Sequence, residues 1–194
     1  MDYRLDKHSL LEFLNLWNKF LKRKVHLIAC GGTALTLQDI KSSTKDVDFL
    51  IPNENEYKYL LKVIEQLGYE LRTGFGWQKP GEVYRFDLYP GKRIHTTELL
   101  ESPLKEGNHI WVKELEHLSV GVLNHYDLII SKLFRGSTVD FDDCLGLFRA
   151  KAGDIDVKRL EERFRETASY DVSEERVINN WEHFKRLLAK ERLI

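Results

Sequence analysis

The chain has 194 residues, of which 42% are hydrophobic and 31% charged, and its formal net charge is -1. This composition is that of an ordinary globular protein and excludes a disordered chain or one that is basic overall. No apolar run approaches the length of a membrane-spanning helix, and the first six residues are too charged for a signal peptide. We therefore expect a cytoplasmic protein with no membrane partner. Cys30 and Cys144 lie far apart among apolar residues, which favours buried reduced thiols over a disulfide.

Helices and strands alternate in the first third of the chain. Apolar residues recur at helical spacing in the first segment, and a buried strand follows it. Asn53 is predicted to cap a helix that Gly68 ends. The predicted helices cover residues 8–23, the segment from the Gly-Gly pair to about residue 38, and residues 54–67. The predicted strands cover residues 25–30 and 47–51.

The pattern then changes from strands to helices. Two strands are predicted at 69–72 and 83–89, joined by a glycine-containing turn and a loop, and one or two more between 110 and 122. One helix ends at Gly136, a second contains Phe141, and two charged helices follow from about 156 and 173. We predict an α/β (α+β) fold, with a mixed β-sheet flanked by helices and a helical C-terminal part. The core would span residues 1–150, and residues 151–194 would pack on it.

Two aspartates stand at alternating positions at the start of the second predicted strand. Asp46 and Asp48 would share one face of that strand, because successive side chains point to opposite faces. Asp87 adds a third carboxylate within another apolar strand. Three strand-borne carboxylates favour a divalent metal, since adjacent buried anions need a cation. Two alternatives stay open: the pair caps an exposed turn, or Asp87 forms a salt bridge with Arg85 on its own strand face.

A glycine pair, Gly31 and Gly32, lies between a predicted strand and a predicted helix. Glycine lets a phosphate approach the backbone, a helix N-terminus favours negative charge, and Thr33 adds a hydroxyl. The Gly-Lys-Ser/Thr ending of a P-loop is missing. The pair therefore predicts either phosphate contacts or no more than a tight turn.

Taken together, these motifs resemble the polymerase-beta-type nucleotidyltransferase superfamily. More narrowly, the chain is similar to the abortive-infection toxin-like nucleotidyltransferases and their uncharacterised relatives. The likeness covers roughly residues 20 to 150. The matching segments are Gly31-Gly32-Thr33-Ala34-Leu35, Thr44-Lys45-Asp46-Val47-Asp48, Asp87, Leu128-Ile129-Ile130-Ser131-Lys132-Leu133 and Asp140-Phe141-Asp142-Asp143.

The resemblance implies a role for each matching position on the strands. Asp46 and Asp48 would hold two Mg²⁺ (or Mn²⁺) ions, and Asp87 would complete the metal site and help activate the acceptor hydroxyl. The phosphates of a nucleoside triphosphate would be held by Gly31, Gly32 and Thr33.

The helical motif implies further contacts with the nucleotide. Lys132 matches a lysine that faces the nucleotide, and Asp140 and Asp143 match two later acids, of which Asp143 is assigned to nucleotide binding. Val139 departs from the pattern, because a basic residue usually precedes the first acid, so the role of the Asp140 region stays open. The alternatives are that Lys132 lies on the solvent side and that Asp142 and Asp143 are ordinary acids of a first helical turn.

The resulting hypothesis is an enzyme that moves a nucleoside monophosphate from a nucleoside triphosphate to an acceptor hydroxyl. The acceptor would be the end of a tRNA or a small molecule. Two other hypotheses stay open. One is a non-catalytic nucleotide-binding module, for example in a toxin–antitoxin pair with an antitoxin protein as partner. The other is a structural domain whose aspartates pair with nearby cations.

Overall fold

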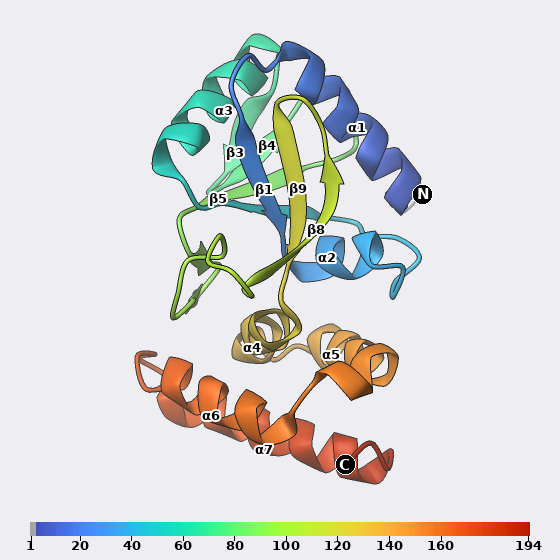
Figure 1. Cartoon of the computed structure of the whole chain (residues 1–194), viewed down its shortest axis with the longest axis vertical. Helices are drawn as coiled ribbons and strands as arrows, with labels where there is room; N and C mark the ends of the chain where they lie inside the picture. Colours follow the sequence, from blue (N-terminus) through green and yellow to red (C-terminus); the bar gives the residue numbers. More distant parts are fainter. Residues whose placement is uncertain (1–2) are drawn as a thin grey trace.

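The computed structural model describes residues 3–194 (Figure 1). The elements in chain order are α1 (Lys7–Phe20), β1 (Val25–Ala29), α2 (Gly31–Leu37), β2 (Val47–Ile51), α3 (Glu54–Gln66), β3 (Glu70–Thr73), β4 (Gly76–Gln78), β5 (Phe86–Pro90), β6 (Arg93–Ile94), β7 (Thr97–Glu98), β8 (His109–Glu114), β9 (Leu118–Leu123), α4 (His125–Arg135), α5 (Thr138–Lys151), a 3-10 helix (Ala152–Asp154), α6 (Val157–Ala168) and α7 (Glu174–Lys190). Within residues 3–194, no helix combines the length and the apolar character needed to cross a lipid bilayer.

The main sheet is mixed and has seven strands in the order β3-β4-β5-β2-β1-β9-β8. Strand β2 pairs in parallel with β5 and antiparallel with β1, and β1 pairs in parallel with β9. The central strands β2 and β9 are buried along their whole length, as their apolar runs predict, whereas the edge strand β3 is exposed throughout. The predicted fold class, a mixed sheet flanked by helices, is confirmed.

Helices α1 and α3 pack together on one face of the sheet. The side chain of Asp6 caps α1 by accepting a hydrogen bond from the backbone of Ser9, and the apolar stripe of the helix faces the sheet. Within that stripe, Trp17 lies 4.7 Å, centroid to centroid, from Phe86 of β5. The hydroxyl of Tyr59, on α3, accepts a hydrogen bond from a backbone N–H just beyond the C-terminal end of α1. Side chains that neighbour Phe86 along β5 therefore point to the opposite face.

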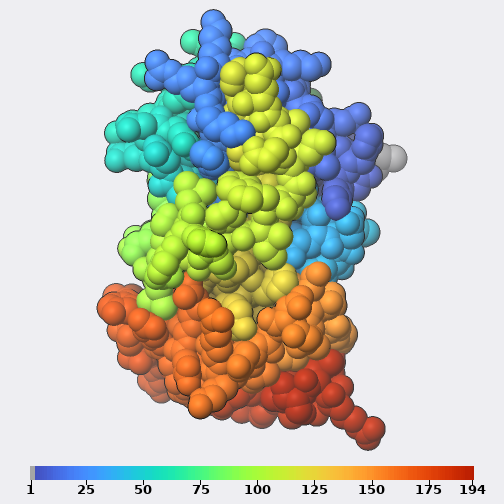
Figure 2. Space-filling view, in the orientation of Figure 1, coloured from blue at the N-terminus to red at the C-terminus, as the bar shows by residue number. Residues whose placement is uncertain are grey.

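The chain beyond the sheet is helical, and it forms a layer across one end of the molecule, coloured yellow to red in Figures 1 and 2. Helix α4 ends at Gly136, whose φ of 68° is left-handed, and Ser137 and Asp140 form a capping box at the start of α5. Helices α6 and α7 contact α4, and Phe164 stacks on Trp181 between them. The helical layer thus begins at His125, and the boundary predicted at residue 150 stays a prediction.

Three short strands in the middle of the chain, β4, β6 and β7, were not predicted, and of these only β4 belongs to the main sheet. Residues 76–78 lie in the segment expected to be a turn and a loop, but they form β4, which pairs with both β3 and β5. Its three residues are too few for a periodic pattern, and Gly76 at its start is typical of a turn. The pairing with β5 is a long-range contact, and it brings Gly76 opposite Asp87.

Candidate active site

Two of the predicted carboxylates lie side by side on the face of the sheet opposite α1 and α3. Strands β2 and β5 are parallel, and their register places Asp48 directly opposite Asp87. Both side chains point away from Phe86 and the α1 layer, because neighbouring residues alternate between faces. The two residues are only 6% and 8% exposed, respectively, so two acids share a poorly hydrated position.

The third carboxylate and an arginine extend this pair toward the start of both strands. Asp46 precedes β2 by one residue and is exposed. Arg85 donates two hydrogen bonds to Asp87, from Nε to Oδ1 and from Nη2 to Oδ2, each 3.1 Å long. Its Nη2 also lies 3.7 Å from Oδ1 of Asp46. The salt bridge that the sequence left as an alternative is therefore present, and no three acidic, histidine or cysteine side chains of residues 3–194 form a compact metal cluster.

The glycine motif lies directly against these carboxylates. Gly31 has a φ of +56°, and a Cβ added to it would lie 2.5 Å from Oδ2 of Asp48. A Cβ on Gly32 would lie 2.7 Å from the hydroxyl oxygen of Thr44. Both glycines are thus required for close packing, the first also by its backbone conformation.

Thr33 connects the glycine motif to the aspartate strand. Its Oγ1 accepts a hydrogen bond from the backbone N–H of Asp48 (2.9 Å) and donates one to the carbonyl of Asp46 (3.2 Å). The side chain is fully buried. Its hydroxyl therefore holds the backbone that carries both aspartates, whereas the sequence predicted contacts of this hydroxyl with phosphate.

Burial and like charge control the protonation of Asp48. Desolvation is the main cause that raises the pKa of this carboxyl to about 7, and the neighbouring charges of Asp87 and Asp46 add to it. Arg135 and Lys132 act in the opposite direction but do not cancel the shift. A cation bound beside Asp48 would relieve this repulsion.

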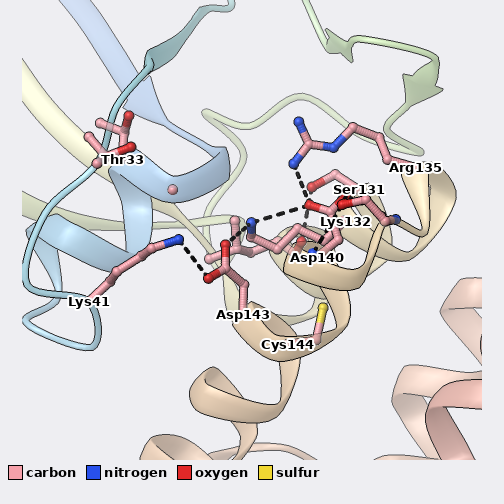
Figure 3. Close-up of polar contacts among 12 residues, drawn as sticks. Thr33, Lys41, Ser131, Lys132, Arg135, Asp140, Asp143 and Cys144 are labelled. Carbon is pink, nitrogen blue, oxygen red and sulfur yellow. Dashed lines mark hydrogen bonds and ion pairs between the residues drawn. The ribbon is translucent and has the colours of Figure 1, made fainter. Parts of the chain in front are cut away.

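Lys132 is the centre of a buried ionic network on the helices (Figure 3). Its side chain is 2% exposed, which contradicts the alternative that it faces solvent. Its Nζ lies 2.7 Å from Oδ2 of Asp143 and 3.6 Å from Oδ1 of Asp140. Lys41 contacts the other oxygen of Asp143 at 2.8 Å. Asp143 thus serves two cations and is not merely an acid of the first helical turn.

The network continues through Asp140 to Arg135. Nη2 of Arg135 lies 2.5 Å from Oδ1 of Asp140, and the hydroxyl of Ser137 donates to Oδ2 of the same carboxylate at 2.7 Å. Burial acts to raise the pKa of Asp140, but the hydrogen bonds from Ser137 and the charge of Arg135 hold it below its ordinary value. Asp140 is therefore an ionised anchor that fixes Arg135 at the edge of the site.

Two residues near the carboxylates were missed by the sequence analysis. Nη1 of Arg135 lies 3.1 Å from Nε2 of His95, and this ring nitrogen lies 4.0 Å from Oδ1 of Asp48. His95 has a φ of +50°, and the hydroxyl of Tyr89 lies 3.0 Å from its Nδ1. Burial is the main cause that lowers the pKa of His95, with the charge of Arg135 second. A lone histidine and a helix-terminal arginine carry no spacing signal that could have identified them.

A cavity of about 400 Å³ joins the carboxylates to the ionic network. Gly32, Asp46, Asp48, Lys132 and Arg135 all contribute to its wall. Five basic and four acidic side chains line it in all. Asp46 and Asp48 come from the strand side, and the helix side, called the cationic wall below, carries Lys132 and Arg135 with their partners Asp140 and Asp143. The lining residues are Arg4, Gly32, Lys41, Thr44, Lys45, Asp46, Asp48, Lys132, Arg135, Ser137, Val139, Asp140 and Asp143.

The donor set fits a hard divalent cation in part. Mg²⁺ is commonly bound through one or two carboxylates together with substrate phosphates and water. Asp46 and Asp48 can supply such a pair, because both line the cavity. Asp87 does not fit the same role in this structure, since both of its oxygens bind Arg85.

Comparisons with known proteins point to one fold. Residues 109–189 match the model of a family described as nucleotidyltransferase of unknown function (DUF6036). This match includes Lys132 and the acids of α5 but not the carboxylates of the strands. No curated protein sequence matches the chain.

One solved nucleotidyltransferase has the same fold, and a second match is weaker. The crystal structure of ANT(2'')-Ia in complex with adenylyl-2''-tobramycin has a TM-score of 0.52 and 14% sequence identity, over 84% of this chain and 94% of that chain. An antigenic nucleotidyltransferase-like protein from Paracoccidioides brasiliensis has a TM-score of 0.43 at 14% identity, over 76% and 79% of the two chains.

The narrower resemblance to abortive-infection toxin-like enzymes stays a prediction. The broader one agrees with both comparisons: the chain has the nucleotidyltransferase fold, and its residues 109–189 match the model of a nucleotidyltransferase family.

Proposed function

We propose that this protein is a metal-dependent nucleotidyltransferase, which moves a nucleoside monophosphate from a nucleoside triphosphate to an acceptor hydroxyl. The observation that carries the proposal is a cavity lined by Asp46 and Asp48 together with Lys132 and Arg135. Asp87 lies in register beside Asp48 on the neighbouring strand. Carboxylates and cations that line one cavity are what a metal–triphosphate complex requires.

The cationic wall would receive the triphosphate. Lys132 and Arg135 are fixed by Asp143 and Asp140, so their positive charges are held in place before a ligand binds. Groups that are positioned in advance need little reorganisation when charge develops on the transferring phosphate. Gly32 lines the same cavity without a side chain, which leaves the backbone accessible to a phosphate oxygen.

The carboxylates would act on the metal and on the acceptor. Asp46 and Asp48 would hold Mg²⁺ or Mn²⁺, which neutralises phosphate charge when bound. Asp87, oriented by its two hydrogen bonds to Arg85, would align the acceptor hydroxyl. Thr33 would keep Asp46 and Asp48 in place through their backbone.

The acceptor is proposed to be a small molecule, with the end of a tRNA as the second class. The structure of ANT(2'')-Ia contains an adenylylated tobramycin, and it has the same fold as this chain. A net charge of -1 gives no overall attraction to RNA. A panel of aminoglycosides and a pool of tRNAs, each incubated with labelled triphosphates and Mg²⁺, separates the two classes.

The test of the proposed function is transfer that depends on the strand carboxylates. Asp48→Asn should reduce transfer by at least a hundredfold, because it removes a charge that positions the metal–triphosphate complex. Asp154→Asn, at an exposed position of the 3-10 helix, is the matched control and should retain activity. Equal transfer by both variants would refute the proposed catalytic role of Asp48.

A non-catalytic nucleotide-binding module is the second candidate function. It is favoured by one observation, the engagement of both oxygens of Asp87 by Arg85. Calorimetric titration with a triphosphate, with and without Mg²⁺, distinguishes the two candidates. Tight binding without metal, together with no transfer to any acceptor, would favour the module.

A further inference from the structure

Arg85 occupies a defined position between two of the three strand carboxylates. Arg85 lies two positions before Asp87, so the two side chains share one face of the sheet. The register of β2 and β5 places Arg85 beside Asp46. Its guanidinium group makes two hydrogen bonds of 3.1 Å to Asp87 and lies 3.7 Å from Asp46. The guanidinium therefore bridges these two carboxylates as a divalent cation would in a site built from all three.

The neighbouring strand leaves room for this arrangement. Gly76 of β4 is paired with Asp87, and a Cβ at Gly76 would lie 2.7 Å from Cδ of Arg85 and 2.8 Å from Oδ1 of Asp87. Any side chain at this position would thus displace the ion pair. The bidentate contact is a packed part of the sheet face, although the arginine side chain is 40% exposed.

The guanidinium group of Arg85 and a second divalent cation would compete for the carboxylate oxygens of Asp87. A carboxylate that accepts two parallel hydrogen bonds from a guanidinium has its best acceptor positions in use. Asp46 and Asp48, in contrast, line the cavity together with Lys132 and Arg135. Two carboxylates with phosphate and water oxygens are enough for one hard cation.

We propose that Arg85 takes the place of a second divalent cation, so that the site binds a single ion through Asp46 and Asp48. This inference rests on the proposed function and narrows it from a two-ion to a one-ion site. Asp87 is then not a metal ligand, and its hydrogen bonds to Arg85 fix the orientation of its carboxylate. The positive charge beside Asp87 is permanent, because a guanidinium stays protonated at all physiological pH values.

The number of bound ions tests this directly. Mn²⁺ is titrated into the protein in the presence of an α,β-methylene nucleoside triphosphate, and bound ions are counted by electron paramagnetic resonance. We expect one isolated Mn²⁺ per chain for the wild type. Arg85→Ala should bind two, with the spin coupling of ions about 4 Å apart. Arg72→Ala, which removes an exposed arginine from β3, should behave as the wild type.

A second variant covers the case in which Arg85→Ala does not fold. Asp87→Asn preserves the shape of the side chain, and it should still bind one Mn²⁺ per chain because Asp87 is not a ligand. Two coupled ions in the wild type, or a single ion in folded Arg85→Ala, would overturn the inference and leave the proposed transfer reaction standing. Absence of any bound Mn²⁺ in the wild type would overturn the inference and the metal dependence together.

Discussion

Replacing Asp48 by asparagine should stabilise the metal-free protein at alkaline pH. The carboxyl is 6% exposed and adjoins Asp87, and these two conditions raise its pKa to about 7. Asparagine has almost the same shape and no charge. It therefore removes the repulsion and the desolvation cost without opening a cavity.

The magnitude follows from the shift in the pKa of Asp48. In the unfolded chain the carboxyl titrates near its ordinary value of 3.8, so between about pH 4 and pH 7 the native state retains a proton that the unfolded state has lost. The free energy of unfolding of the wild type falls as pH rises through this window, because the native state binds more protons there. The full shift corresponds to about 4 kcal/mol, of which about 2 kcal/mol develops between pH 5 and pH 7.

Urea unfolding of both proteins at pH 5 and pH 8, in the presence of a chelator, measures this effect. The stability advantage of Asp48→Asn should be larger at pH 8 than at pH 5 by about 3 kcal/mol. The same residue serves ligand binding, so Mg²⁺ with a triphosphate should raise the Tm of the wild type and not that of the variant. An advantage that does not change with pH, or a variant that is less stable than the wild type at pH 8, would refute the reasoning.

Three further predictions concern the network, the glycine pair and pH. Lys132→Met should abolish transfer and lower the free energy of unfolding by about 3–5 kcal/mol, because the buried acids Asp140 and Asp143 lose their cation. Lys151→Met, measured in the same transfer and unfolding assays, should cost far less. Gly31→Ala should destabilise the fold by roughly 1–3 kcal/mol, since its φ is +56° and its Cβ would press on Asp48; Gly153→Ala, where nothing lies within 4 Å of the added Cβ, is the control in thermal unfolding. Calorimetry should show the affinity for Mg²⁺ and triphosphate rising about tenfold from pH 6 to pH 8, because Asp48 must lose its proton to bind; a flat profile would contradict this.

Local patterns predicted the parts of the site that depend on one element. The alternation of Asp46 and Asp48 predicted that both side chains share one face of the chain at β2, and both line the cavity. The motif around Lys132 predicted that this lysine lies near them, and it lines the same cavity with a buried side chain. The likeness to nucleotidyltransferases also came from such local motifs. The cap at Asn53 is found as predicted.

Pairings between distant segments could not be predicted in the same way. The contact of Arg85 with Asp46 depends on the register of β2 and β5. The space for the Arg85 side chain depends on the missing side chain of Gly76, in a strand of three residues. His95 reaches the site from the tight turn between β6 and β7, with a left-handed backbone that no pattern in the sequence indicates. The hydroxyl of Thr33, expected at a phosphate, is used within the fold.

The proposed function is tested most directly by following the label from two forms of the same triphosphate. With an accepting small molecule or tRNA, label on the α-phosphate should enter the acceptor, and label on the γ-phosphate should leave as pyrophosphate, in equal amounts. Both should vanish in the double variant Asp46→Asn, Asp48→Asn. Transfer of the γ-label to the acceptor, or α-label transfer that survives in the double variant, would contradict the account.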